Sequence, residues 1–123
     1  MQSIIVKELI KEEDLKNCLS AFFKDKPVSI ACLDLERVQS EDILFEYVFL
    51  QGDFKFELCL YTKTLFSIEE LSLSICKKFK TQVLISDNTI NPYIWILINE
   101  TGKFSTVEQI NRDDDLFLIK NPV

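Results

Sequence analysis

The sequence predicts an α+β fold: a mostly antiparallel sheet, with a mixed or curled sheet as the variant, and two helices packed on one of its faces. Apolar runs of strand length are numerous, and only two segments have helical spacing. The expected order, β-α-β-β-β-α-β-β-β-β, supplies too few helices to cross over between every pair of strands. At 123 residues, one domain spanning residues 1–123 can bury its own core.

Two segments carry the helical period. In the first, apolar residues follow an acidic opening and lie on one face, and Pro27 marks its end. These residues are Leu15, Cys18, Leu19, Phe22 and Phe23. The second begins at Ser67, whose spacing to Glu70 is that of a capping box. It continues through Ile68, Leu71, Ile75 and Phe79.

The expected strands are apolar, β-branched or aromatic runs separated by polar or turn-forming residues. They cover residues 3–8, 28–33, 44–50, 54–61, 82–86, 93–99, 103–109 and 116–120. Gly52 lies between two of these runs, where a positive φ costs glycine little, so a hairpin is expected. In its second arm Cys59 falls on the more polar face, which makes it the cysteine expected to be most reachable.

The strand 93–98 is apolar on both faces. Tyr93, Trp95 and Leu97 point to one side, and the three isoleucines between and after them point to the other. Two helices can cover only one face of so wide a sheet. The second face is therefore either packed on loops and on the curled sheet itself, which is the preferred interpretation, or kept as an aromatic patch for a partner.

Composition narrows the function classes. A net charge of −6 repels phosphate backbones and attracts basic partners, so nucleic acid is a disfavoured ligand. No apolar run is long enough to cross a membrane, and no export signal is visible at the start of the sequence. Without histidine or paired cysteines a metal role is remote, and no cofactor is expected. The four cysteines indicate free thiols in a reducing cytoplasm.

The residues for common catalytic schemes are missing. There is no histidine to act as a general base, and two glycines are too few for a phosphate-binding loop. Arg37 and Arg112 are the only arginines. The prediction is that the chain is not an enzyme; an enzyme that uses carboxylates or Cys59 is the less favoured alternative.

Carboxylates are abundant, and each group has two interpretations. Those at 12–14 and 69–70 open the predicted helices and complement the helix dipole. The remaining acids fall in predicted loops and serve either solubility or recognition of a basic partner. For the run Asp113, Asp114 and Asp115, a solvated loop is favoured first, a basic partner second and a divalent metal third. The candidate partner-binding residues are Asp34, Glu36, Glu41, Asp42, Asp53, Asp87, Tyr93, Trp95, Asp113, Asp114 and Asp115.

One segment carries a resemblance to a known class of proteins. Residues 82–105, QVLISDNTINPYIWILINETGKFS, resemble a stretch of the immunity proteins of contact-dependent growth inhibition and related polymorphic toxin systems. The size and acidity of the chain are also similar to theirs. The resemblance implies a cytoplasmic bacterial antidote that binds one cognate toxin domain, often a basic nuclease, and blocks its active site or substrate groove.

Two function hypotheses follow. The first is an immunity protein that neutralises a basic, nuclease-type toxin domain and is a monomer or weak homodimer when free. The alternative is a non-enzymatic adaptor or self-associating structural domain that uses the aromatic strands around Tyr47 and Trp95. A salt-sensitive association rate would favour the first, and a stable homodimer that buries Trp95 would favour the second.

Overall fold

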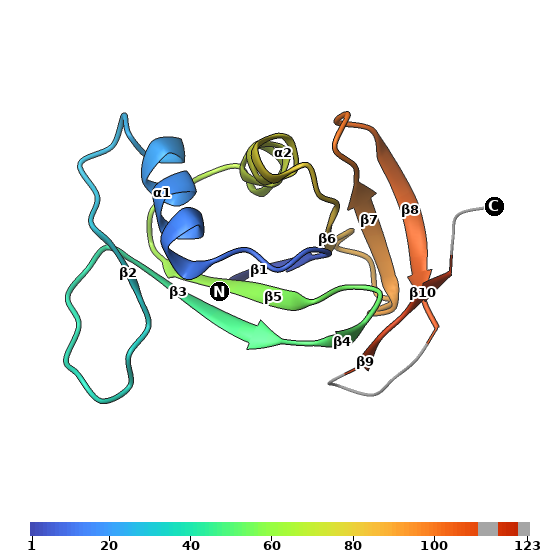
Figure 1. The fold of residues 1–123 in the computed structure, drawn as a ribbon, viewed down its shortest axis with the longest axis horizontal. Coiled ribbons are helices and arrows are strands. Elements are labelled where there is room, and N and C mark those ends of the chain that lie inside the picture. Colours follow the sequence, from blue (N-terminus) through green and yellow to red (C-terminus); the bar gives the residue numbers. More distant parts are fainter. Residues whose placement is uncertain (111–115, 121–123) are drawn as a thin grey trace.

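The computed structural model describes residues 1–110 and 116–120, and it shows an α+β fold with a mixed sheet (Figure 1). The large sheet has eight strands in the order β10-β8-β7-β6-β1-β5-β3-β2, and β4 and β9 form a small two-stranded sheet. The strands are β1 (Gln2–Val6), β2 (Ile30–Cys32), β3 (Ile43–Phe49), β4 (Gln51–Gly52), β5 (Phe56–Thr62), β6 (Val83–Ser86), β7 (Ile94–Ile98), β8 (Phe104–Gln109), β9 (Leu116–Phe117) and β10 (Ile119–Lys120). The helices are α1 (Glu12–Phe22) and α2 (Ile68–Phe79).

Most strand pairs in the large sheet are antiparallel, as the sequence predicts. The exception in the described part is β2, which runs parallel to β3 at one edge. The predicted strand 116–120 is split in the structure: β9 pairs with β4, and β10 pairs with β8. A single apolar run therefore serves two different sheets, which its sequence period does not reveal.

Both helices lie on the same face of the sheet, as expected (Figure 1). Leu15 and Leu19 of α1 and Leu71 and Ile75 of α2 are fully buried against the strands in the main core. The predicted cap of α2 is confirmed, because Ser67 Oγ accepts from the backbone N–H of Glu70 at 3.2 Å. Helix α1 ends at Phe22, several residues before Pro27.

The opposite face of the sheet carries a second hydrophobic cluster at one end. Trp95 and Leu97 of β7 pack there with buried residues of other strands and of the hairpin that follows β3. The buried members are Ile5, Phe54, Leu84, Val107 and Phe117. The ring of Phe117 meets Trp95 edge-on at 5.5 Å. The strand is thus apolar on both faces, and at this end the chain itself covers the second face.

The hairpin between β3 and β5 is confirmed, but its turn residues form a strand of their own. Gln51 and Gly52 pair with β9, and Gly52 has φ 100°. A Cβ atom at Gly52 would lie 2.5 Å from the carbonyl oxygen of Phe117. Glycine is therefore required here twice, for its conformation and for the close approach of β9.

The expectation for Cys59 is wrong. Cys59 lies on the more polar face, but it is only 4% exposed. Its short side chain sits among those of Glu46, Glu57 and Tyr61, its neighbours along and across the strands. Cys32 is the described cysteine that is only partly buried; Cys18 and Cys76 are buried, and all four thiols are free.

Candidate partner-binding groove

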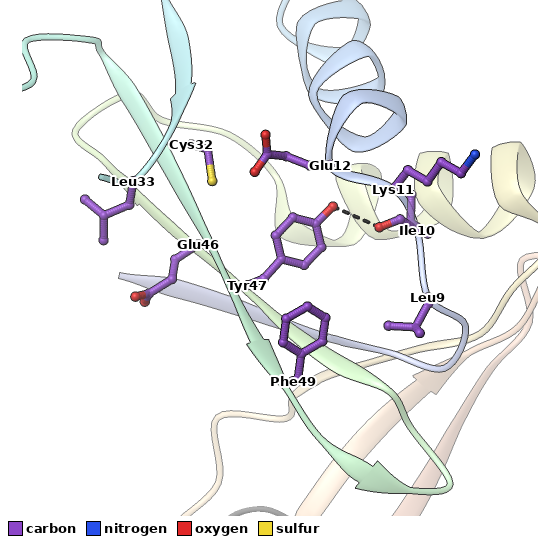
Figure 2. Close-up of a pocket in the computed structure, with 9 residues that line it drawn as sticks. All are labelled: Leu9, Ile10, Lys11, Glu12, Cys32, Leu33, Glu46, Tyr47 and Phe49. Atoms are coloured by element: carbon purple, nitrogen blue, oxygen red, sulfur yellow. Dashed lines mark hydrogen bonds between the residues drawn. The ribbon is translucent and has the colours of Figure 1, made fainter. Parts of the chain in front are cut away.

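A groove of about 750 Å³ opens beside the outer half of β3. Its wall on one side is the segment that joins β1 to α1, and on the other it is the end of β2 (Figure 2). The lining residues are Leu9, Ile10, Lys11, Glu12, Cys32, Leu33, Glu46, Tyr47 and Phe49. Most of this surface is apolar.

Tyr47 forms the centre of the groove (Figure 2). Its hydroxyl donates to the carbonyl oxygen of Ile10 at 3.0 Å, which ties β3 to the segment before α1. Its ring stacks on Phe49, with the two ring centres 6.1 Å apart. Burial, and then the nearby Glu12 carboxylate, raise the pKa of Tyr47 well above its usual range. The phenol therefore stays a hydrogen-bond donor across the physiological pH range.

Two large apolar side chains at the groove are exposed. Leu9 is 63% exposed and Phe49 is 71% exposed. Leu9 lines the groove from the β1–α1 segment, and Phe49 lines it from β3. Single exposed apolar residues are common, but apolar residues gathered beside a concave surface are typical of interaction sites.

Two carboxylates, those of Glu12 and Glu46, line this groove. Glu12 opens α1, and Glu46 lies on β3, where one of its oxygens accepts from the Tyr61 hydroxyl at 3.0 Å. The pKa of the Cys32 thiol is raised to about 11, first by burial and then by Glu12, with a smaller contribution from Asp34. Lys11 is the one basic residue among those that line the groove.

The loop 33–42, which leaves the groove at Leu33, brings four predicted site residues together: Asp34, Glu36, Glu41 and Asp42. Two of them have structural partners. Asp34 accepts from the backbone N–H of Glu36 at 3.0 Å and pairs with Arg37 at 3.2 Å. Asp42 accepts from the backbone N–H of Ser29 at 2.9 Å.

Glu36 is exposed, and Glu41 has one carboxylate oxygen that is buried without a hydrogen-bond partner among the described residues.

The other predicted site residues lie apart from this loop. Asp53 accepts from the backbone N–H of Ile119 at 3.0 Å, and Asp87 accepts from that of Thr89 at 3.0 Å. Tyr93 is partly buried just before β7, and the indole N–H of Trp95 donates to Gln109 at 3.2 Å. Asp113, Asp114 and Asp115 lie outside the described residues.

The groove includes residues that the sequence did not single out for partner binding. Glu12 was assigned to the dipole of α1, and it does lie in the first turn of that helix. Glu46 is the one charged residue in the aromatic strand 44–50, and nothing in the sequence around Leu9 indicates a binding site. These residues line one groove because the segment between β1 and α1 passes beside β3. Leu9 and Glu12 therefore lie near Glu46, which is far from them in the sequence.

The described residues offer neither a metal site nor an activated thiol. Within residues 1–110 and 116–120, no group of three or more His, Cys, Asp or Glu side chains could hold a metal ion. Burial is the largest cause of a raised pKa for all four thiols. Thiols of this kind are protonated at neutral pH and are weak nucleophiles.

Comparison with protein-family models, with curated proteins and with solved structures gives no significant match for this chain. The resemblance of residues 82–105 to immunity proteins therefore stays a prediction. In the described part of the chain, neither helix has the length and apolarity that crossing a membrane requires.

Proposed function

We propose that this chain is an immunity protein that binds a cognate, basic toxin domain of the nuclease type and neutralises it by covering its active site or substrate groove. The observation that carries the proposal is the groove beside β3. It combines two exposed apolar side chains, Leu9 and Phe49, with two lining carboxylates, those of Glu12 and Glu46. An acidic loop lies next to it.

The chemistry of such a toxin fits this surface. A nuclease displays lysines and arginines where it binds phosphate, and carboxylates on a rigid inhibitor can occupy the same positions. The net charge of −6 would attract the toxin over a distance set by ionic strength. The apolar floor of the groove would supply the short-range contacts that hold the complex together.

The direct test uses the gene immediately upstream of the one that encodes this chain. The C-terminal domain of its product is expressed in bacteria with and without the chain, and growth is measured. We expect the domain to stop growth alone and the chain to restore it. A harmless domain, or a toxic domain that the chain does not neutralise, would refute the proposed function.

A pair of variants tests the surface. The double variant Glu12→Gln, Glu46→Gln removes two carboxylates at the groove, and its control, Glu100→Gln, Glu108→Gln, removes two exposed carboxylates elsewhere. Both change the net charge equally. We expect the groove variant to lower affinity for the toxin domain by about tenfold or more and the control by a smaller factor.

Ionic strength supplies an independent measurement. The screening length falls from about 30 Å at ~0.01 M salt to about 8 Å at ~0.15 M. The association rate with the basic domain should therefore fall markedly over this range, whereas dissociation should change less. An association rate that is indifferent to salt would argue against electrostatic attraction.

A second candidate function is self-association, as in an adaptor or structural domain. The exposed Phe49 at the edge of a sheet favours it, because unpaired edges can join to one another. Light scattering separates the two hypotheses. A stable homodimer in which Phe49 becomes buried would support the second candidate, and a monomer would support the first.

A further inference from the structure

The outer edge of β3 is only partly occupied. β2 pairs with β3 from Ile43 to Phe45, and the N–H of Leu33 adds a last bond to the carbonyl of Phe45. After Leu50 the chain continues as β4, which pairs with β9. Among the described residues, none pairs with the outer edge of β3 at Tyr47 and Phe49.

The hydrogen-bonding pattern shows which peptide groups face this gap. The N–H of Leu50 donates to Lys55 of the hairpin, so the even-numbered residues of β3 bond to β5. The odd-numbered ones face the other way: the N–H of Ile43 donates to Ser29, and the carbonyl of Phe45 accepts from Leu33. The N–H and C=O groups of Tyr47 and Phe49 therefore point outward and are available to another strand.

The side chains around the gap differ between the two faces of the sheet. On the helix face lie the apolar groove and its rings, Tyr47 and Phe49. On the opposite face β3 presents Glu46 and Val48, because neighbouring residues of a strand point to opposite sides. A strand placed in the gap would meet the apolar groove with every second side chain, and Glu46 and Val48 with the others.

We propose that the edge of β3 at Tyr47–Phe49 binds an extended segment of a partner protein by strand addition, with apolar side chains in the groove and lysine or arginine side chains facing Glu46. The proposal rests on the proposed function and specifies how the basic partner is held. Backbone bonds supply affinity in this mode, and the alternating side chains supply specificity.

Charge selects this occupant over a second copy of the chain. Two copies joined edge to edge would bring together two molecules that each carry a net charge of −6. Like charges of this size repel one another. A segment that alternates basic and apolar residues meets the opposite charge instead, with its apolar side chains on the groove side.

The probe is the acetylated, amidated peptide Lys-Val-Lys-Val-Lys-Val-Lys, with Glu-Val-Glu-Val-Glu-Val-Glu as control. Amide exchange is followed by NMR on the intact chain. We expect the basic peptide to slow exchange at Tyr47 and Phe49 by about tenfold or more, and to leave Val48, already bonded to β5, nearly unchanged. Equal effects of both peptides, no binding, or protection confined to other residues would overturn the proposal.

Two variants separate the backbone from the ring. Phe49→Pro removes the outward N–H without removing a bond to β5, and proline is tolerated at such edge positions. Phe49→Ala removes the ring and keeps the N–H. We expect Phe49→Pro to bind the basic peptide about fivefold to tenfold more weakly than Phe49→Ala does. Equal affinities of two variants that are both shown to be folded by circular dichroism would contradict strand addition.

The same variants distinguish this inference from the proposed function. If the chain neutralises the upstream toxin domain and Phe49→Pro does so as well as Phe49→Ala, strand addition is wrong and the immunity function stands. If the chain does not neutralise the domain but the peptide protects Tyr47 and Phe49, the edge is a binding site and the immunity function is wrong.

Discussion

Two apolar regions of the molecule, the second cluster and the groove, differ in what covers them. The second cluster, around Trp95, is closed by Phe54 of the hairpin and by Phe117 of β9, which are 1% and 6% exposed. The groove beside β3 is open, and Phe49 remains largely exposed. Apolar residues that the chain covers itself contribute to folding, whereas those left uncovered at an edge are available to a partner.

The largest expected difference in the free energy of unfolding is between variants at Phe54 and Phe49, two phenylalanines of the same hairpin. Phe54→Ala empties a buried site and should lower the free energy of unfolding by about 3–5 kcal/mol. Phe49→Ala removes an exposed ring and should lower it by less than about 1 kcal/mol. Urea denaturation of both variants measures the difference. Similar losses would mean that the groove is as closed as the second cluster.

The next largest expected difference in stability is between variants at Gly52 and Gly102, which both have positive φ. At Gly52 a Cβ would collide with the Phe117 carbonyl, whereas at Gly102 the nearest atom is a Leu73 methyl at 3.5 Å. Gly102→Ala should cost about 1–2 kcal/mol from its backbone conformation. Gly52→Ala should cost a further 1–3 kcal/mol, approximately, because β9 must move. Equal thermal stabilities of the two variants would show that β9 does not close the second cluster.

A smaller effect concerns the polar contact at the border of the second cluster. Trp95→Phe removes the indole N–H that donates to Gln109. The loss of this hydrogen bond should lower the free energy of unfolding by about 1 kcal/mol, in addition to the effect of the smaller buried ring. Far-UV circular dichroism is the suitable probe, since Trp95 is the only tryptophan. In a cycle with Gln109→Ala the two changes should be coupled; additive losses would refute the contribution of this bond.

The smallest effect concerns the Cys32 thiol in the groove. Its pKa of about 11 in the folded chain lies above the value of about 8.5 for an unfolded cysteine. The folded state therefore favours the protonated thiol, and the stability from this preference is present below pH ~8.5 and is lost as pH rises toward 11.

Alkylation at Cys32, located by peptide mapping, should accordingly keep accelerating up to about pH 11, whereas in denaturant its rate should level off near pH ~8.5. The basic peptide should slow this alkylation if it fills the groove. A plateau at the same pH in both states would contradict the effect of burial and of Glu12.

Much of the fold could be predicted because its signals are local. The capping box at Ser67, the apolar period of α2 and the hairpin at Gly52 each depend on residues within one turn or one strand pair. The site was less predictable. Asp34, Glu36, Glu41 and Asp42 share a loop because they are neighbours in sequence, but Asp53 and Asp87 turned out to accept hydrogen bonds from backbone groups near them.

The sequence by itself determined the fold class, the amphipathic helices, the two-faced apolar strand and the surplus of negative charge, because periodicity and composition act over short distances. Only the tertiary structure decided which apolar face is covered and that Cys59 is enclosed. It also decided that no residue of 1–110 or 116–120 pairs with the edge of β3 at Tyr47 and Phe49. Burial and edge pairing depend on contacts between residues distant in sequence, and no local pattern specifies those contacts.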